Sequence, residues 1–296
     1  MLSPRRERER GATLAELLVA LVLFASVGGA ALGALATQQR FARRTLQRLV
    51  ARRAARDAAD ALRSDLRPIA PSRGDLLALG ATRIEFRGAI GNAVVCAVDL
   101  GRSVLHLPPR EAAGGALTSW VVPPVAGDTL LVRVPAPLPD AARWEAHVLA
   151  ADPARGACPL AGGLVASAAE SSSAIALRVA PPLSSGVRAG APVRVVRRER
   201  YELYRGGDGG WYLGFTDCRG GRSTPCAVVQ PVSGPFAPGG VAFSYRGAAG
   251  EETSIPPLVK SVRVLLVGEG TTTSSTSALR MRAVSESVAV TITPRN

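Results

Sequence analysis

The sequence predicts an α+β protein in which one long N-terminal helix packs on a β-rich, mainly antiparallel globular head. Two observations support this fold class. Residues 12–67 follow a helical pattern without a break, and residues 68–296 contain short apolar runs separated by Gly, Pro and Ser, which is typical of many short strands. The chain therefore divides into a short N-terminal segment at 1–11, a helix at 12–67 and a head at 68–296.

An apolar segment occupies residues 12–36 and contains a single charged side chain, Glu16. As a helix, with a rise of about 1.5 Å per residue, it extends for about 37 Å, which is enough to cross the hydrocarbon core of a bilayer. Residues 1–11 carry four arginines against two glutamates, and this excess favours a cytoplasmic N-terminus. We therefore predict a single membrane-spanning segment at 12–36, with the head on the opposite side of the membrane.

The helical pattern continues beyond the apolar segment through residues 37–67. Apolar side chains recur there three and four positions apart, with Arg and Asp between them, and Pro68 ends the pattern. We expect this amphipathic half to pack on the sheet of the head. Its apolar positions are Phe41, Leu46, Leu49, Val50, Ala54, Ala58, Ala61, Leu62 and Leu66.

An ordinary secretory signal is the alternative interpretation of the apolar segment. Residues 34–36 read Ala-Leu-Ala, which forms a small-x-small cleavage site before Thr37. Two features disfavour this alternative. An ionised Glu16 is costly inside an apolar run and serves no purpose in a generic signal, and a cleaved signal would not form the first half of one continuous helix.

The residues around Glu16 resemble the class III signal of type IV prepilins and type II secretion pseudopilins. The resemblance lies in Gly11 followed by the run ATLAELLVAL at 12–21. In that family, prepilin peptidase cleaves after the glycine on the cytoplasmic side and methylates the new N-terminus. The resemblance therefore implies that 1–11 is a leader, that cleavage falls between Gly11 and Ala12, and that Ala12 is N-methylated. The sequence departs from the family at Ala12, where the family usually has Phe.

The same resemblance implies an assembly role for Glu16. Cleavage creates an α-amino cation at Ala12, four residues before Glu16 and on the same face of the helix. In the family, this glutamate pairs with the terminal amine of a neighbouring subunit as the protein leaves the membrane and packs into a filament. Because pairing offsets the cost of burying the carboxylate, we expect Glu16 to set the register between subunits rather than to catalyse a reaction.

The clearest strand pair in the head is an antiparallel hairpin of residues 198–204 and 211–215. The glycine-rich run 205–210 joins them and permits the positive φ angles of a tight turn. The order of helix and then sheet resembles the pilin fold, and the size of the head, the hairpin and the closing run VAVTITPRN resemble the large minor pilins of the PilW and PulJ type. The full set of predicted strands is 82–87, 93–99, 103–107, 119–122, 129–134, 143–150, 174–180, 193–204, 211–216, 241–245, 261–267 and 283–293.

The four cysteines of the chain can oxidise if the head lies outside the cytoplasm. Four cysteines allow three connectivities. We favour Cys218 with Cys226, which are close in sequence, and this choice leaves Cys96 with Cys158. A zinc site is disfavoured, because the sequence has neither a tight C-x-x-C pair nor clustered histidines.

No catalytic motif was found in the sequence. It has no G-x-S-x-G elbow and no H-E-x-x-H pattern, and its one lysine, Lys260, follows Val259 rather than the glycine of a phosphate-binding loop. Asp208 lies among glycines, and one carboxylate does not make a calcium site, because calcium takes six or more oxygen ligands. We therefore expect no enzymatic activity, no catalytic residue, no cofactor and no metal.

Nucleic-acid binding by the head is an alternative, because the chain carries a formal net charge of +13. Arginine and aromatic side chains are the groups on which single strands stack. However, alternation along a strand sends successive side chains to opposite faces, and Glu199 and Glu202 interrupt the charge, so a solvated strand face is favoured. The basic and aromatic cluster comprises Arg188, Arg194, Arg197, Arg198, Arg200, Arg205, Tyr201 and Tyr204.

The residues and the resemblance together lead us to expect a minor pilin or pseudopilin subunit. Its expected partners are prepilin peptidase, the inner membrane and, through the N-terminal helix, other pilins and minor pilins. It would sit in the inner membrane as a single-pass protein with a periplasmic head and then join the tip or initiation complex of a type IV pilus or a type II secretion pseudopilus. The alternatives are the DNA-binding head of an uptake pilus and a membrane-anchored or secreted β-domain with an ordinary signal.

Overall fold

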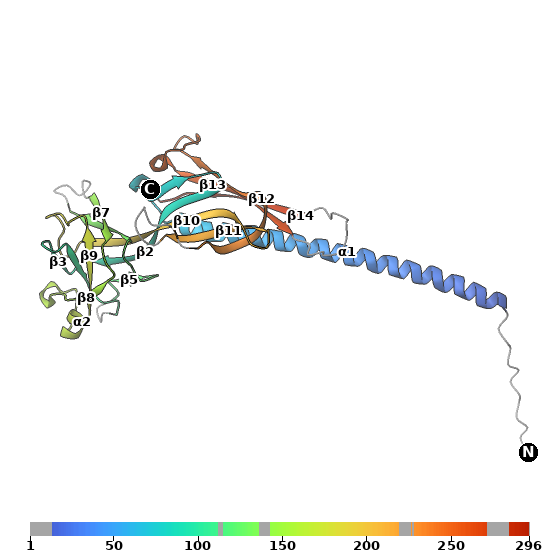
Figure 1. Cartoon of the computed structure of the whole chain (residues 1–296), viewed down its shortest axis with the longest axis horizontal. Helices are drawn as coiled ribbons and strands as arrows, with labels where there is room; N and C mark the ends of the chain where they lie inside the picture. The colour runs from blue at the N-terminus through green and yellow to red at the C-terminus, as the bar shows by residue number, and fades with distance from the viewer. Residues whose placement is uncertain are drawn as a thin grey trace, which may run out of the picture.

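The computed structural model describes residues 14–111, 115–135, 143–218, 226, 228–270 and 284–295. It confirms an α+β fold in which helix α1 (Leu14–Leu66) packs through its C-terminal part on a β-sheet head (Figure 1). Every strand pairing in this part of the chain is antiparallel. The expected leader and the Gly11–Ala12 junction lie outside the described residues.

Helix α1 is continuous over 53 residues and spans about 80 Å at a rise of about 1.5 Å per residue. Its last turns lie on β12, β13 and β14, and Figure 1 shows the rest of the helix projecting away from the head. Small side chains dominate the buried face, which allows the helix backbone to approach the sheet closely. The buried residues are Ala51, Ala54, Ala55, Ala58, Ala59, Leu62 and Leu66.

The packed face of α1 is shorter than the sequence pattern indicates. Phe41, Leu46, Leu49 and Val50 are exposed, although their spacing predicted contact with the sheet. For Phe41 and Leu46 the reason is the length of the sheet: the described part of β13 ends at Gly270, which lies against Gln47, so the helix runs on beyond its support. Leu49 follows Gln47 and lies two residues from the buried Ala51, which places it on the opposite side of the helix.

Fourteen strands form the head within the described residues, in the order β14-β13-β12-β11-β10-β6-β7-β9-β4-β3, with β2 also pairing with β10. Short helical turns connect them at η1 (Pro71–Arg73), η3 (Leu160–Gly162), α2 (Ala168–Ser172) and η4 (Pro256–Leu258). The strands are β1 (Leu76–Leu79), β2 (Arg83–Val94), β3 (Ala97–Asp99), β4 (Val104–Leu107), β5 (Ser119–Trp120), β6 (Thr129–Val134), β7 (Arg143–Leu149), β8 (Ala154–Gly156), β9 (Ala174–Ala180), β10 (Pro192–Arg205), β11 (Trp211–Cys218), β12 (Gln230–Arg246), β13 (Ser261–Gly270) and β14 (Val284–Ile292).

The predicted hairpin is confirmed, with β10 and β11 paired from Arg198 opposite Cys218 to Arg205 opposite Trp211. The sequence missed β1 and β8, and it wrongly broke β2 at 88–92. The interrupted stretch contains two glycines, and both lie within the strand. A Cβ at Gly88 would collide with the Glu199 carboxylate, and a Cβ at Gly91 would collide with the Trp120 ring, so glycine permits close approach there.

The predicted strand at 93–99 is also wrong, because the chain leaves the ladder between β2 and β3. Val95 donates its backbone N–H to the Ala191 carbonyl at 2.9 Å, and Cys96 enters a disulfide. The run of apolar residues from 93 to 98 continues through this break, which is why the pattern suggested one strand.

Two hydrophobic cores lie along the head, and strands β2 and β10 run through both (Figure 1). The core beside the helix, here called the proximal core, joins α1 to β11, β12, β13 and β14 and to one end of β2 and β10. The distal core joins the other end of β2 and β10 to β4, β5, β6, β7 and β9. Examples are Leu62, Phe86 and Phe236 in the proximal core and Ile90, Leu105 and Val195 in the distal core.

Candidate functional site

The exposed half of α1 is the first candidate surface. Glu16 lies in the first described turn of the helix and is exposed, as are Leu17, Leu18 and Phe24. The helix is long and apolar enough to cross a membrane, and none of its most apolar window is buried within the protein. Large apolar side chains in such a continuous patch indicate a membrane or a partner surface. Because Gly11 and Ala12 lie outside the described residues, the structure does not test the expected cleavage site.

The junction of helix and head is held by backbone proximity and by side-chain hydrogen bonds. A Cβ at Gly268 of β13 would collide with the carbonyl oxygen of Ala51, and a Cβ at Gly270 would lie 2.6 Å from the Gln47 Cβ. The Ser233 hydroxyl donates to the Ala54 carbonyl at 2.7 Å. These contacts come from different strands, so together they fix both the height and the rotation of the helix on the sheet.

A buried ion network, here called the Arg197 network, lies where the two cores meet. Arg197 on β10 is 2% exposed, and its Nε and Nη2 donate to the two carboxylate oxygens of Asp128, each at 2.7 Å. Its Nη1 donates to Asp217 of β11 at 3.2 Å, and its Nη2 also donates to the Pro123 carbonyl at 3.2 Å. The hydrogen bonds that Arg197 donates to Asp128 are the largest cause of its raised pKa. A buried arginine with this many acceptors ties β10 and β11 to the turn that precedes β6.

A carboxyl group with a strongly shifted pKa lies next to this network. Burial, followed by the negative charges of Asp65 and Asp217, raises the pKa of Glu199 to about 8. Beside it, the Tyr201 hydroxyl donates to Asp65 of α1 at 2.6 Å, and burial together with this hydrogen bond raises the pKa of Tyr201. This shift favours the protonated form of Glu199 at neutral pH, which lessens its repulsion with Asp65 of α1 and Asp217 of β11. Such shifts occur in catalytic sites and in structural networks alike, and here the neighbours of Glu199 are elements of the fold.

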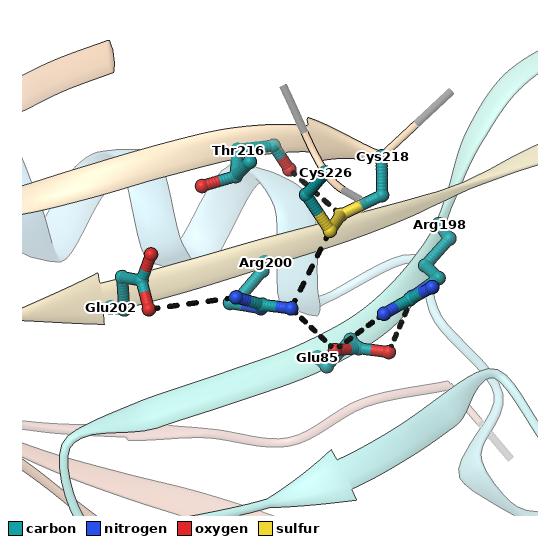
Figure 2. The surroundings of a disulfide bond; sticks show 7 residues. All are labelled: Glu85, Arg198, Arg200, Glu202, Thr216, Cys218 and Cys226. Carbon is teal, nitrogen blue, oxygen red and sulfur yellow. Dashed lines mark hydrogen bonds and ion pairs between the residues drawn. A yellow bond between two sulfur atoms is a disulfide. The ribbon is translucent and has the colours of Figure 1, made fainter. Parts of the chain in front are cut away.

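The opposite face of β10 and β11 carries the disulfide between Cys218 and Cys226, shown in Figure 2. Arg200 points toward it, with its Nη2 3.4 Å from the Cys226 Sγ. The same guanidinium lies 3.4 Å from Glu85, whose other oxygen accepts a 2.6 Å hydrogen bond from Arg198. Two arginines therefore share one carboxylate beside the disulfide.

The second disulfide joins Cys96 to Cys158, and both sulfurs pack with Val165 and Ala174 in a small core of their own. Both bonds follow the connectivity favoured from the sequence, Cys218 with Cys226 and Cys96 with Cys158. Each connects segments that the strand ladder alone does not bring together. The disulfides therefore stabilise the irregular parts of the head.

The basic and aromatic cluster does not form one cationic surface. Arg197 is buried, while Arg198 and Arg200 point to the other face and pair with Glu85. Tyr201 is also buried, with its ring stacked 6.0 Å from that of Phe86. Strand alternation thus separates these groups, as the sequence suggested, and the two arginines that lie together pair with Glu85 and Glu202.

The two histidines lie apart. His147 is buried, with Nδ1 2.9 Å from the Pro181 carbonyl, and His106 Nδ1 accepts from the Ala157 N–H at 3.3 Å. Across the residues that the structure describes, His, Cys, Asp and Glu form no group of three or more that could hold a metal ion. These contacts give both histidines a role in the packing of the distal part of the head.

Sequence reasoning missed the Arg197 network and the shifted Glu199. Asp128 and Arg197 are 69 residues apart, and no spacing rule relates them. The available signal was the alternation of charged and apolar residues along β10, which placed Arg197 and Glu199 on the same face as Tyr201.

Comparisons with models of protein families, with curated protein sequences and with solved structures found no match. The fold and its surfaces define the protein as an α+β chain with one N-terminal helix able to span a membrane and a disulfide-bonded antiparallel head.

Proposed function

We propose that the protein is a minor pilin or pseudopilin subunit that is cleaved and N-methylated by prepilin peptidase and assembled through its N-terminal helix. The observation that carries the proposal is the division of α1 into two halves. One unbroken helix has its C-terminal part buried on the head, while the preceding apolar part is exposed. Such a helix needs a bilayer before assembly and neighbouring helices after it.

Glu16 supports the same proposal, because a carboxylate inside a membrane segment needs a cation. Cleavage after Gly11 supplies one at the amino group of Ala12, within reach of Glu16 on the same subunit or on a neighbour. The head carries two disulfides, which suit a periplasmic or surface location. We assign no catalytic role to any residue and no cofactor or metal to the protein.

The mass of the mature N-terminus tests the processing step. The protein, purified from membranes of cells that contain prepilin peptidase, should begin with N-methyl-Ala12. A chain that begins at Thr37 indicates an ordinary signal, and a chain that retains Met1 indicates a simple anchor. Either result refutes the proposal.

The variant Glu16→Leu tests the assembly step. We expect it to be cleaved and to remain in the membrane but to be lost from sheared filament fractions, because the terminal amine then lacks its partner. Ser26→Leu is the matched control, since it adds an apolar side chain to the same exposed helix without removing a charge. Equal recovery of both variants in filaments would exclude this role for Glu16.

DNA binding by the head is the weaker candidate, because Arg197, Arg198 and Arg200 are already engaged by carboxylates. It predicts that the full chain in detergent binds single-stranded DNA with an affinity that falls steeply as salt rises. We expect no such binding at low ionic strength.

A further inference from the structure

Strand β14 forms an open edge of the sheet. In the described part of the chain it pairs with β13 alone, from Gly270 opposite Val284 to Val262 opposite Ile292, with no bulge in the register. The backbone N–H and C=O of every second residue of β14 therefore point away from β13. The strand reads VSESVAVTI, in which Glu286 is the one charge and proline does not occur.

β14 is much longer than the other strands at the periphery of the sheet. β1, β3, β5 and β8 each have two to four residues, whereas β14 has nine. Proteins normally protect long edges with lysine, proline or bulges, because an open edge otherwise pairs with another chain. The length and composition of β14 therefore indicate that another strand covers it.

A groove runs between this edge and helix α1. Its volume is about 330 Å³. Apolar residues form part of its wall, namely Ala59 of α1 and Val288 and Val290 of β14. A groove bounded by a helix on one side and an open strand on the other is the geometry in which extended peptides add to a sheet.

The charges of the groove favour an acidic occupant. Arg52 and Arg56 line it, are exposed, and have no ion-pair partner among the residues that the structure describes. Arg63 also lines it but lies 3.5 Å from Asp60, and the remaining carboxylate of the wall is Glu286. Arg52 and Arg56 are the last two of five arginines on α1 that are spaced four residues apart. This spacing places neighbouring guanidinium groups on the same face of the helix. The row comprises Arg40, Arg44, Arg48, Arg52 and Arg56.

We propose that an extended, acidic segment of a partner polypeptide binds in this groove as an additional strand on β14, with its carboxylates against Arg52 and Arg56. Backbone hydrogen bonds to the edge provide the affinity, and alternate side chains provide the specificity. Glutamates on one face of the added strand meet the arginines of α1, while the side chains between them lie on the opposite face. This site does not depend on cleavage at Gly11 or on the role of Glu16.

Alternately N-methylated peptides test the strand geometry. The probe is a fluorescein-labelled peptide of about eight residues, the length of one strand, that alternates Glu and Val. Its binding to the full chain in nonionic detergent is followed by fluorescence anisotropy. An added strand directs only every second N–H toward β14, so methylation of one alternate set of nitrogens should abolish binding and methylation of the other set should leave it unchanged. Equal binding of both methylated peptides and the parent would overturn the proposal.

Charge-reversal variants test the groove itself. We expect Arg56→Glu to weaken binding of the peptide at least about tenfold, because a like charge then faces its carboxylates. Arg53→Glu is the matched control, since it makes the same change of net charge one turn away, at an exposed position outside the groove that pairs with Asp57. Equal losses for the two variants would overturn the proposal. Equally effective displacement of the peptide by a single-stranded oligonucleotide or by anionic vesicles would do the same, because it would show attraction to any polyanion.

Discussion

The replacement Gly268→Ala probes how closely helix α1 lies on the sheet. The added Cβ would overlap the carbonyl oxygen of Ala51, which belongs to the helix backbone and cannot move by a change of rotamer. Overpacking of this kind costs about 1–3 kcal/mol. Alanine also lowers the conformational entropy of the unfolded chain, and this offsets about 0.4–1 kcal/mol of the loss. Taking the middle of the two ranges, we expect the free energy of unfolding to fall by about 1.3 kcal/mol.

The assay is chemical denaturation of the full chain in nonionic detergent, followed by tryptophan fluorescence, with a shift of about 2–4 °C per kcal/mol expected in a parallel thermal scan. Gly207→Ala is the control, because a Cβ at Gly207 meets no atom within 4 Å. It should raise the free energy of unfolding by about 0.4–1 kcal/mol, the effect on the unfolded chain alone. If Gly268→Ala is as stable as the original chain while Gly207→Ala behaves as expected, then the helix does not approach the sheet as described and the reasoning fails.

Three further predictions concern the cores and the charges of the head. Leu62→Ala should lower the free energy of unfolding by about 2–5 kcal/mol, because it leaves a cavity in the proximal core; a loss below about 1 kcal/mol in denaturant titrations would mean that α1 is loosely packed. Because the folded pKa of Glu199 is raised from 4.5 to about 8, its contribution to stability is present below pH 4.5 and is lost as the pH rises through about 8. Glu199→Gln should therefore flatten the decline of melting temperature between these pH values, and an unchanged decline would assign it to other groups. Joint replacement of Cys218 and Cys226 by Ser should cost about 2–4 kcal/mol under non-reducing conditions and leave stability under reducing conditions unchanged, and a loss in both conditions would point to packing instead.

The sequence predicted the helix and the hairpin well because local rules determine both. The periodic pattern up to Pro68 contains no competing signal, and a glycine-rich turn fixes the partners and register of 198–204 and 211–215. The end of the helix–sheet contact was not predictable. Phe41 and Leu46 belong to the same apolar pattern as Leu62, but both precede Gln47, against which the described part of β13 ends, and both are exposed.

The ionic features of the head were beyond sequence reasoning for a related reason. Arg197, Asp128 and Asp217 come from three strands or turns, and their proximity depends on the crossing of β10 from one core to the other. Gly88 and Gly91 fall between the predicted strands 82–87 and 93–99, in a stretch that belongs to β2. Their true role, close approach to Glu199 and Trp120, becomes visible only when the neighbouring strands are in place.

The two strands that pass through both cores have a mechanical consequence. β2 and β10 are paired from Pro192 opposite Val94 to Glu202 opposite Arg83, so one ladder of hydrogen bonds joins the far end of the head to the helix. Both strands leave the proximal core side by side and enter the distal core side by side, so a load between the two cores is carried by two covalent backbones rather than across the hydrogen bonds between them. The Arg197 network links β10 to Asp217 of β11 and to Asp128 before β6 near the middle of this ladder, and so ties the two strands to the rest of the sheet.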